Sequence, residues 1–341
     1  MRKKVLAIYT GGTIGMEKEY TSGSLYPLDF EHILDKIPEI ALLDCEVDIH
    51  SFDRPLDSSD IGPDEWKKFA HCIEENYHLY DGFLILHGTD TMSYSASALS
   101  FMLFGLKKPV IFTGSQLPVG DLRTDAKENL ITSLYYACLY ENGEAVIQEV
   151  AIYFEYKLFR ANRTLKYSAE NFDAYKSPNY PLLGSSGVNL QINKENLWRT
   201  ASKDFFADLH LSTKVFFWRV LPGVSLQNLK NILVLTNTKI LLLQVYGTGT
   251  LSGAKDTLTS LEKIRNSGIE IIVLSQCISG KICFGKYENS NLFNHLGAIS
   301  AGDMTLESAF VKTLHLLDNP RYKEESFSDL FSKNLKGEKS P

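Results

Sequence analysis

Residues 5–15 read VLAIYTGGTIG, an apolar run followed directly by a turn of glycines and hydroxyl residues. The pattern returns where His87-Gly88-Thr89-Asp90-Thr91 follows Phe83–Leu86, and where Thr113-Gly114-Ser115-Gln116 follows Val110–Phe112. Short apolar runs that end in such turns are typical of buried parallel strands. The carboxyl ends of parallel strands share one edge of a sheet, where open α/β sheets bind ligands. The sequence therefore predicts one polar site built from several strand ends.

The rest of the chain extends this α/β pattern. Further strands are predicted at 150–154, 215–220, 239–245 and 271–274, and helices at 63–75, 95–104 and 126–140, the last capped by Asp125. We expect a large N-terminal domain (1–192) with a mainly parallel sheet flanked by helices. An ordered linker (193–213) and a smaller C-terminal α/β domain (214–341) follow, and the polar end, Lys333–Pro341, is expected to fray.

Composition excludes several classes of protein. Net charge is −6 with the two signs mixed, so nothing indicates a nucleic-acid partner. The five cysteines are scattered without a CxxC pair, which argues against zinc and fits a reducing compartment. Val5–Tyr9 is too short for the core of a signal peptide, and no apolar stretch approaches the roughly 20 residues of a membrane helix. We expect a cytoplasmic protein with no metal, no cofactor and no membrane contact.

The turn Thr10–Gly15 has two interpretations. A nucleotide phosphate loop fits poorly, because Gly11 and Gly12 are adjacent and no lysine follows. Alternatively, Thr13 is a nucleophile on a tight turn, with backbone N–H groups placed to bind an oxyanion. Thr89 and Asp90 add a second hydroxyl beside a carboxylate, and this pattern favours hydrolase chemistry.

These motifs resemble those of the bacterial-type L-asparaginases, and most closely their cytoplasmic, type I branch. The first signature is Tyr9–Gly15 and the second is Gly82–Met92. Further segments agree in order: Leu56–Asp60, Phe112–Gln116, Arg160–Lys166 and Gln276–Lys281. The resemblance spans nearly the whole chain and is weakest around 193–213.

The resemblance implies a mechanism and a set of roles. Thr13 would attack the side-chain amide carbon of L-asparagine to form a β-aspartyl ester, and Tyr26, from a mobile loop over residues 17–26, would help to take its proton. Thr89, Asp90 and Lys166 would form a second triad, in which a desolvated, neutral lysine serves as base.

It also implies how the substrate is held and how the chain assembles. Asp90 would hold the α-ammonium group of the substrate, and Ser58 and Ser59 its α-carboxylate, with Asp57 supporting their loop. In this family the site lies between subunits of an intimate homodimer that often pairs into a tetramer.

Each role has a structural alternative. Thr13 and Thr89 could simply cap helices, and Lys166 could be a solvated surface lysine. Tyr20 competes with Tyr26 for the role in the loop. By the resemblance His87 is a structural histidine at a strand end, and Cys277 and Cys283 are expected to be buried thiols rather than nucleophiles.

The chain also departs from the family pattern. The turn Tyr246–Thr250 carries threonines where relatives commonly have asparagine, which would alter contacts across the dimer interface and selectivity between asparagine and glutamine. Some type I relatives bind a second, allosteric asparagine through a threonine and an arginine, and Leu165 and Gln244 occupy those positions here. Loss of both partners for a carboxylate predicts that the allosteric response is absent.

Two rival functions remain. One relative is the amidase subunit of a tRNA-dependent amidotransferase, which usually has an extra N-terminal domain, whereas this chain starts at its first strand. The other rival is a catalytically silent amino-acid sensor that uses the same cleft, for which two nucleophile-type triads would be unnecessary.

Overall fold

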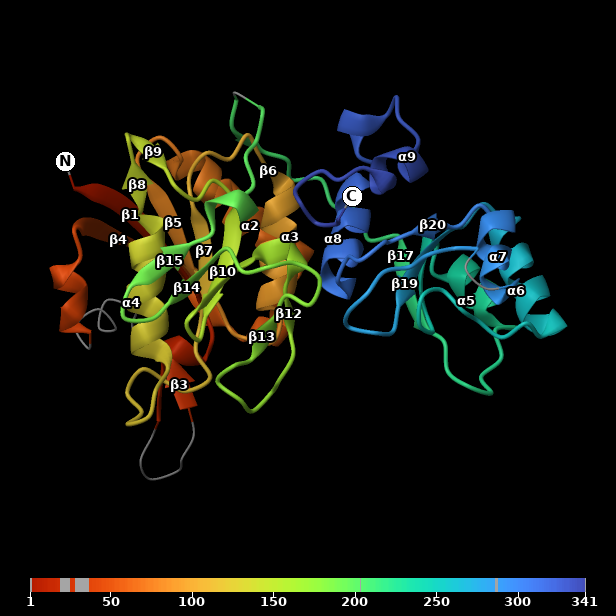
Figure 1. Cartoon of the computed structure of the whole chain (residues 1–341), viewed down its shortest axis with the longest axis horizontal. Coiled ribbons are helices and arrows are strands. Elements are labelled where there is room, and N and C mark those ends of the chain that lie inside the picture. Colours follow the sequence, from red (N-terminus) through yellow and green to blue (C-terminus); the bar gives the residue numbers. More distant parts are fainter. Residues whose placement is uncertain (1, 19–24, 28–36, 203, 286–287, 341) are drawn as a thin grey trace. The chain divides into compact units, whose positions relative to one another are not determined.

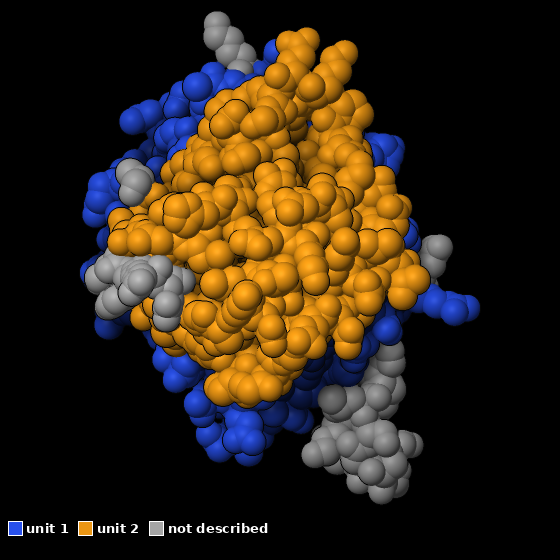
Figure 2. Space-filling view, turned by 90° about the vertical axis from the view of Figure 1, so that its right-hand side faces the viewer, with its two compact units in different colours: residues 1–209 blue, residues 210–341 orange. Residues whose placement is uncertain are grey.

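The computed structural model describes residues 2–18, 25–27, 37–202, 204–285 and 288–340. The chain divides into two compact units, residues 1–209 and 210–341, coloured separately in Figure 2. The first unit thus extends to Leu209, into the predicted linker of residues 193–213. In particular, Asp208 donates its backbone N–H to the carbonyl of Met102 (2.8 Å).

The first unit is built on an eight-stranded sheet of order β15-β14-β11-β10-β7-β5-β1-β4. The five strands from β10 to β4 are parallel: β10 (Val150–Phe154), β7 (Val110–Thr113), β5 (Gly82–Leu86), β1 (Lys3–Gly11) and β4 (Cys45–Leu56). The remaining three are antiparallel to their neighbours: β11 (Lys157–Arg160), β14 (Gly184–Ser186) and β15 (Leu190–Ile192). The predicted mainly parallel sheet is confirmed.

Helices cover both faces of this sheet, with α4 (Ala126–Ala137) on one and α2 (Pro63–Asn76) and α3 (Met92–Met102) on the other (Figure 1). Both faces of the sheet need a covering layer, because successive side chains of each buried strand point to opposite faces. One face and α4 share a buried cluster that contains Val5, Ala7, Leu130 and Leu134.

Small two-stranded pairs complete the first unit. They are formed by β2 (Met16–Lys18) with β3 (Leu25–Pro27), β6 (Leu103–Phe104) with β16 (Phe206–Ala207), β8 (Tyr140–Glu141) with β9 (Glu144–Ala145), and β12 (Leu165–Lys166) with β13 (Tyr175–Lys176).

The second unit has a parallel sheet of order β17-β18-β19-β20: β17 (Val215–Arg219), β18 (Ile240–Val245), β19 (Glu270–Ser275) and β20 (Ile299–Ser300). One face packs on α5 (Leu229–Leu235), α6 (Lys255–Arg265) and α7 (Glu288–His295). The other packs on α8 (Leu306–Leu316) and α9 (Phe327–Ser332). Among the helices in the described parts of the chain, none is long and apolar enough to cross a membrane.

Two predicted helices have different bounds. The helix expected at 95–104 begins at Met92 and ends at Met102, because Leu103 and Phe104 turn extended and pair with β16. The helix expected to reach Tyr140 ends at Ala137, and Tyr140 begins the β8–β9 hairpin. Asn142 and Gly143, both with positive φ, form its turn, an Asn-Gly signal for a hairpin.

The capping role predicted for Asp125 is wrong. Asp125 occupies the N-cap position of α4, but its carboxylate makes no capping hydrogen bond there. It accepts instead from the backbone N–H groups of Gln116 and Leu117 (3.0–3.1 Å) and from Asn129 (3.2 Å). Burial raises the pKa of this carboxyl group. Asp125 therefore anchors the turn after β7.

The fraying predicted for the C-terminal end is also wrong for residues 333–340. Glu338 is fully buried and its carboxylate lies 2.5 Å from the ammonium of Lys312, which is equally buried on α8. Lys312 also donates to the backbone carbonyls of Phe331 and Lys333. The C-terminal segment 333–340 is therefore held in place by the buried ion pair between Glu338 and Lys312.

Candidate active site

Backbone contacts between glycines bring the predicted turns together at the carboxyl edge of the first sheet. A Cβ added to Gly12 would lie 2.4 Å from the Cα of Gly88, and one added to Gly88 would lie 2.7 Å from the Ser58 side chain. Gly12 also has a φ of 88°, which L side chains rarely adopt. No side chain fits between these turns, so Thr13 and Thr89, each one residue further on, are held near each other.

Neither threonine is a helix cap. Thr13 opens a short 3₁₀ turn, Thr13–Gly15, whose N-cap is Gly12, and its side chain is half-buried. Helix α3 begins at Met92, so Thr89 precedes its N-cap, Thr91. The capping interpretation of both threonines is therefore excluded.

Thr89, Asp90 and Lys166 meet as one cluster. The Lys166 ammonium donates to the Thr89 hydroxyl (2.8 Å) and to Asp90 Oδ1 (2.7 Å). Its side chain is only 15% exposed, so the alternative of a solvated surface lysine is wrong, whereas the Asp90 side chain is 68% exposed. Asp90 therefore offers an accessible carboxylate at the edge of a buried hydroxyl–amine pair.

The segment Asp57–Ser59 lies beside this cluster. Ser58 is buried against Gly88, and its carbonyl accepts from the Thr91 hydroxyl (2.5 Å). Asp57 accepts from both the backbone N–H (2.8 Å) and the hydroxyl (2.7 Å) of Ser59, and these bonds lower the pKa of its carboxyl group. Both hydrogen-bond donors of Ser59, the backbone N–H and the hydroxyl, therefore point to the Asp57 carboxylate. These two bonds hold the Asp57–Ser59 segment together.

Of the two tyrosines considered for the mobile loop, only Tyr26 has a described backbone. The backbone of Tyr26 belongs to β3 and pairs with Glu17 of β2. Tyr20 lies outside the described residues.

His87 is a fully buried structural histidine. Its Nδ1–H donates to the carbonyl of Gly88 (2.7 Å), so Nε2 accepts from Ser95 (2.8 Å), whose oxygen in turn accepts from the Trp66 indole (2.9 Å). Burial lowers the pKa of His87 to about 4. A neutral imidazole therefore holds the Gly88–Thr89 turn in place through its hydrogen bond to the Gly88 carbonyl.

Two residues at the cluster were not assigned a role from the sequence. Tyr175 pairs with Lys166 across the β12–β13 hairpin and donates its hydroxyl to the backbone carbonyl of Thr89. Burial and the charge of Asp90 raise its pKa well above the usual range. Gln116 accepts from the Thr89 hydroxyl (3.2 Å). Its turn was visible in the sequence, whereas nothing there marks Tyr175, because its position depends on the hairpin.

The cysteines after β19 differ from expectation. Cys277 and Cys283 are exposed rather than buried, because they lie in the surface loop that follows the strand. The expectation that both are buried thiols is wrong.

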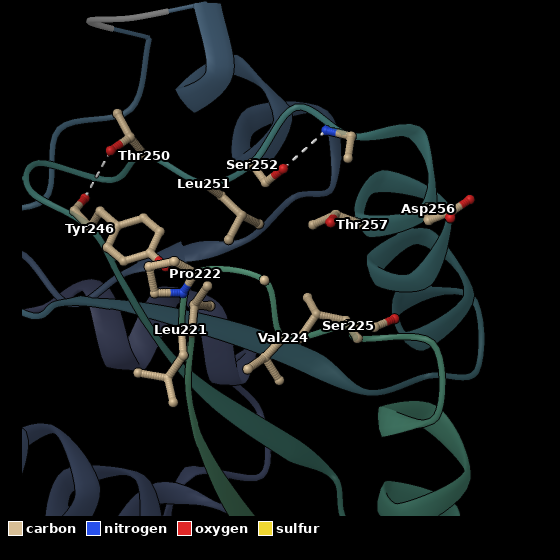
Figure 3. A pocket seen from close by; sticks show the side chains of 14 residues that line it. Leu221, Pro222, Val224, Ser225, Tyr246, Thr250, Leu251, Ser252, Asp256 and Thr257 are labelled. Carbon is tan, nitrogen blue, oxygen red and sulfur yellow. Dashed lines mark hydrogen bonds between the residues drawn. The ribbon is translucent and has the colours of Figure 1, made fainter.

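The second unit carries its own open cavity of about 650 Å³ (Figure 3). It is lined by the loop after β17, the turn after β18 and the start of α6, including Leu221, Val224, Tyr246 and Asp256. Figure 3 shows the Thr250 hydroxyl directed at the carbonyl of Tyr246 (3.2 Å), so this threonine closes its own turn.

A hydroxyl hydrogen-bonded to a lysine, with an exposed carboxylate beside them at the carboxyl edge of a parallel sheet, is the arrangement expected of an enzyme active site on an α/β fold. Family models agree: residues 4–198 match "Asparaginase, N-terminal" and residues 214–331 match "Glutaminase/Asparaginase C-terminal domain". The chain belongs to the asparaginase family.

Individual relatives support this assignment. L-asparaginase 1 of Escherichia coli is 37% identical over 341 residues, which cover 100% of this chain and 99% of the relative. The structure of L-asparaginase I from Vibrio cholerae has a TM-score of 0.88 at 35% identity and full coverage of both chains. The structure of the thermostable L-asparaginase from Thermococcus kodakarensis has the same TM-score of 0.88 at 28% identity and 99% coverage of each chain.

Proposed function

We propose that this protein hydrolyses L-asparagine to L-aspartate and ammonia, with Thr13 as the nucleophile. The observation that carries the proposal is the Thr89–Lys166–Asp90 cluster, held beside Thr13 by the contact between Gly12 and Gly88. The match to L-asparaginase 1 over nearly the full length of both chains supports the same reaction.

The reaction proceeds through an ester. Thr13 Oγ1 bonds to the side-chain amide carbon while its proton passes to a base, for which Tyr26 is the candidate. The carbon–nitrogen bond breaks, and the nitrogen leaves as ammonia with a proton from the site. Water then cleaves the β-aspartyl ester. As water bonds to the ester carbon, its proton moves to Thr89 Oγ1 and the Thr89 proton moves to the amine form of Lys166, 2.8 Å away. The bond between the ester carbon and Thr13 Oγ1 then breaks, and Thr13 Oγ1 takes back the proton that the site gained from water.

Charge and exposure suggest how the substrate is held. The Asp90 carboxylate is exposed enough to meet the α-ammonium group of asparagine. The α-carboxylate would bind at Ser58 and Ser59, where the Ser59 hydroxyl must turn from Asp57 to donate to it. Asp57 then keeps the loop in place through the Ser59 backbone N–H.

The test is ammonia release by the purified protein with L-asparagine, and with L-glutamine in parallel. We expect turnover of asparagine, and loss of turnover by orders of magnitude in Thr13→Ala. Thr236→Ala, at a helix end in the second unit, controls for the loss of a threonine hydroxyl. No ammonia from either amide would refute the proposal.

The two rival functions give different results in the same experiments. A silent sensor would bind asparagine equally well before and after Thr13→Ala and release no ammonia from either form. An amidase subunit would need a partner and a charged tRNA, so turnover of free asparagine by the chain alone argues against it.

Assembly and location are part of the proposal. We expect a homodimer or homotetramer, with the Tyr246–Thr250 turn at an interface between copies, which light scattering on a sizing column tests directly. The free state of all five cysteines fits the reducing cytoplasm. A monomer with full activity would contradict the expected assembly.

We also propose that the rate curve with asparagine is hyperbolic. Leu165 offers no polar group, and the Gln244 amide is engaged with the carbonyl of Ser275 (3.0 Å). Neither supplies the charged donors that a second asparagine carboxylate would need. A sigmoidal curve would contradict this.

A further inference from the structure

Gln116 joins the Thr89 hydroxyl to the loop of the β12–β13 hairpin. Its side-chain oxygen accepts from Thr89 Oγ1 (3.2 Å), and its Nε2 donates to the carbonyls of Asn171 (3.0 Å) and Ala169 (3.4 Å). Its backbone N–H is held by the buried Asp125 carboxylate. Both ends of this residue are therefore fixed.

The orientation of the Gln116 amide follows from its partners. Backbone carbonyls only accept hydrogen bonds, so the NH₂ group of the amide must face Ala169 and Asn171. The oxygen is then the atom directed at Thr89. Gln116 thus presents an acceptor, and no donor, to the Thr89 hydroxyl.

The direction of the Thr89 proton follows in the same way. The Lys166 ammonium has no acceptor, so it donates to a lone pair of Thr89 Oγ1. The single hydroxyl proton of Thr89 is left to point at Gln116. Each hydrogen bond of the Lys166–Thr89–Gln116 chain has one possible direction while the lysine is protonated.

We propose that Gln116 is a positioning residue: by accepting from the Thr89 hydroxyl it keeps Thr89 Oγ1 2.8 Å from the Lys166 nitrogen, the distance across which the Thr89 proton passes to the lysine during the reaction. When Lys166 is an amine, its lone pair becomes a second acceptor for that proton. Thr89 then turns its hydroxyl from Gln116 to Lys166, and its own lone pair faces the proton of the attacking water. The inference rests on the proposed function, because it assigns a step of that hydrolysis.

A purely structural role makes a different prediction. Gln116 could matter only because its NH₂ group ties the hairpin loop to the turn after β7. The hairpin has another tie at the same place, since the Tyr175 hydroxyl donates to the Thr89 carbonyl. The two roles depend on different atoms of Gln116: its oxygen accepts from the Thr89 hydroxyl, and its nitrogen donates to the hairpin loop. Substitutions that remove one atom and keep the other therefore distinguish the two roles.

The experiment compares Gln116→Met with Gln116→Glu by steady-state ammonia release. Methionine has a similar length but offers neither a strong acceptor nor a donor, whereas glutamate keeps an oxygen acceptor and loses the NH₂ donors. Gln148→Met is the matched control, because Gln148 is half-buried and its side chain donates to the carbonyl of Ala145 (3.2 Å), away from the cluster. Thermal unfolding of each variant shows that it is folded.

We expect Gln116→Met to lower kcat by roughly 3- to 10-fold, the range of one neutral hydrogen bond, with KM within about twofold of wild type. Gln116→Glu should recover a substantial part of that loss. Wild-type kcat in Gln116→Met would overturn the inference. Equal losses in both variants would also overturn it, because they would place the role on the NH₂ group. An inactive wild-type protein would instead refute the proposed function itself.

Discussion

The buried imidazole of His87 makes the stability of this protein depend on pH in a calculable way. Its folded-state pKa is about 4, against about 6.5 for an exposed histidine. Between these values the unfolded chain binds a proton that the folded chain does not. Stability from this group is therefore full above about pH 7 and falls as the pH drops toward 4.

The size of the effect follows from the shift. Each pKa unit corresponds to about 1.4 kcal/mol, so the contribution lost by pH 4 is about 3 kcal/mol, and at pH 5 it is about 2 kcal/mol. Carboxylates also titrate in this range, so the informative quantity is a difference between variants. His87→Gln removes the titrating group and retains one donor and one acceptor for Gly88 and Ser95.

The assay is urea unfolding at a fixed protein concentration, from pH 7.5 to pH 4.5, followed by tryptophan fluorescence. One of the three tryptophans, Trp66, donates to Ser95 of the same chain of hydrogen bonds. The difference in free energy of unfolding between wild type and His87→Gln should shrink by about 2–3 kcal/mol as the pH falls. His71→Gln, at an exposed histidine, controls for removal of an imidazole as such. A difference that stays constant within about 0.5 kcal/mol would refute the reasoning that His87 is buried in neutral form.

Two further predictions concern the backbone contact and the C-terminal end. Gly12→Ala should abolish asparagine turnover and destabilise the fold by more than Gly143→Ala, since both glycines have φ near 85–88° but only Gly12 meets backbone, at Gly88. Strain alone costs about 1–2 kcal/mol, so equal losses in the two variants, measured by urea unfolding, would contradict the close contact. Glu338→Ala should lower the free energy of unfolding by about 3–5 kcal/mol, because it leaves the ammonium of Lys312 buried without its partner. A loss below about 1 kcal/mol in the same assay would mean that water reaches that lysine.

Much of the fold could be predicted from local pattern. The strands Val5–Tyr9, Phe83–Leu86 and Val150–Phe154 lie within or match observed ones, because a short apolar run between polar turns has few other stable environments. The helix expected at 63–75 was also correct to within one residue, since Pro63 and the acidic residues after it mark a helix start.

Errors arose where distant segments compete for the same residues. Leu103 has the spacing of a helical residue, yet it is drawn into a strand by Phe206 and Ala207, about a hundred positions away. Asp125 stands at a helix start, yet the backbone of Gln116 and Leu117 takes its carboxylate. Local propensities are small, so a tertiary partner readily overrides them.

The sequence by itself determined where strands and turns follow one another along the chain. From this came the expectation that Thr13, Thr89 and Asp90 gather at one edge of a sheet. It did so because hydrophobic periodicity and glycine placement are local properties. Only the tertiary structure decided that Lys166 is buried against Thr89, that Tyr175 and Gln116 hold the same threonine, and that Glu338 fastens the C-terminal end. A polar side chain goes where a partner compensates its loss of water, and that partner is fixed by the packing of the whole fold.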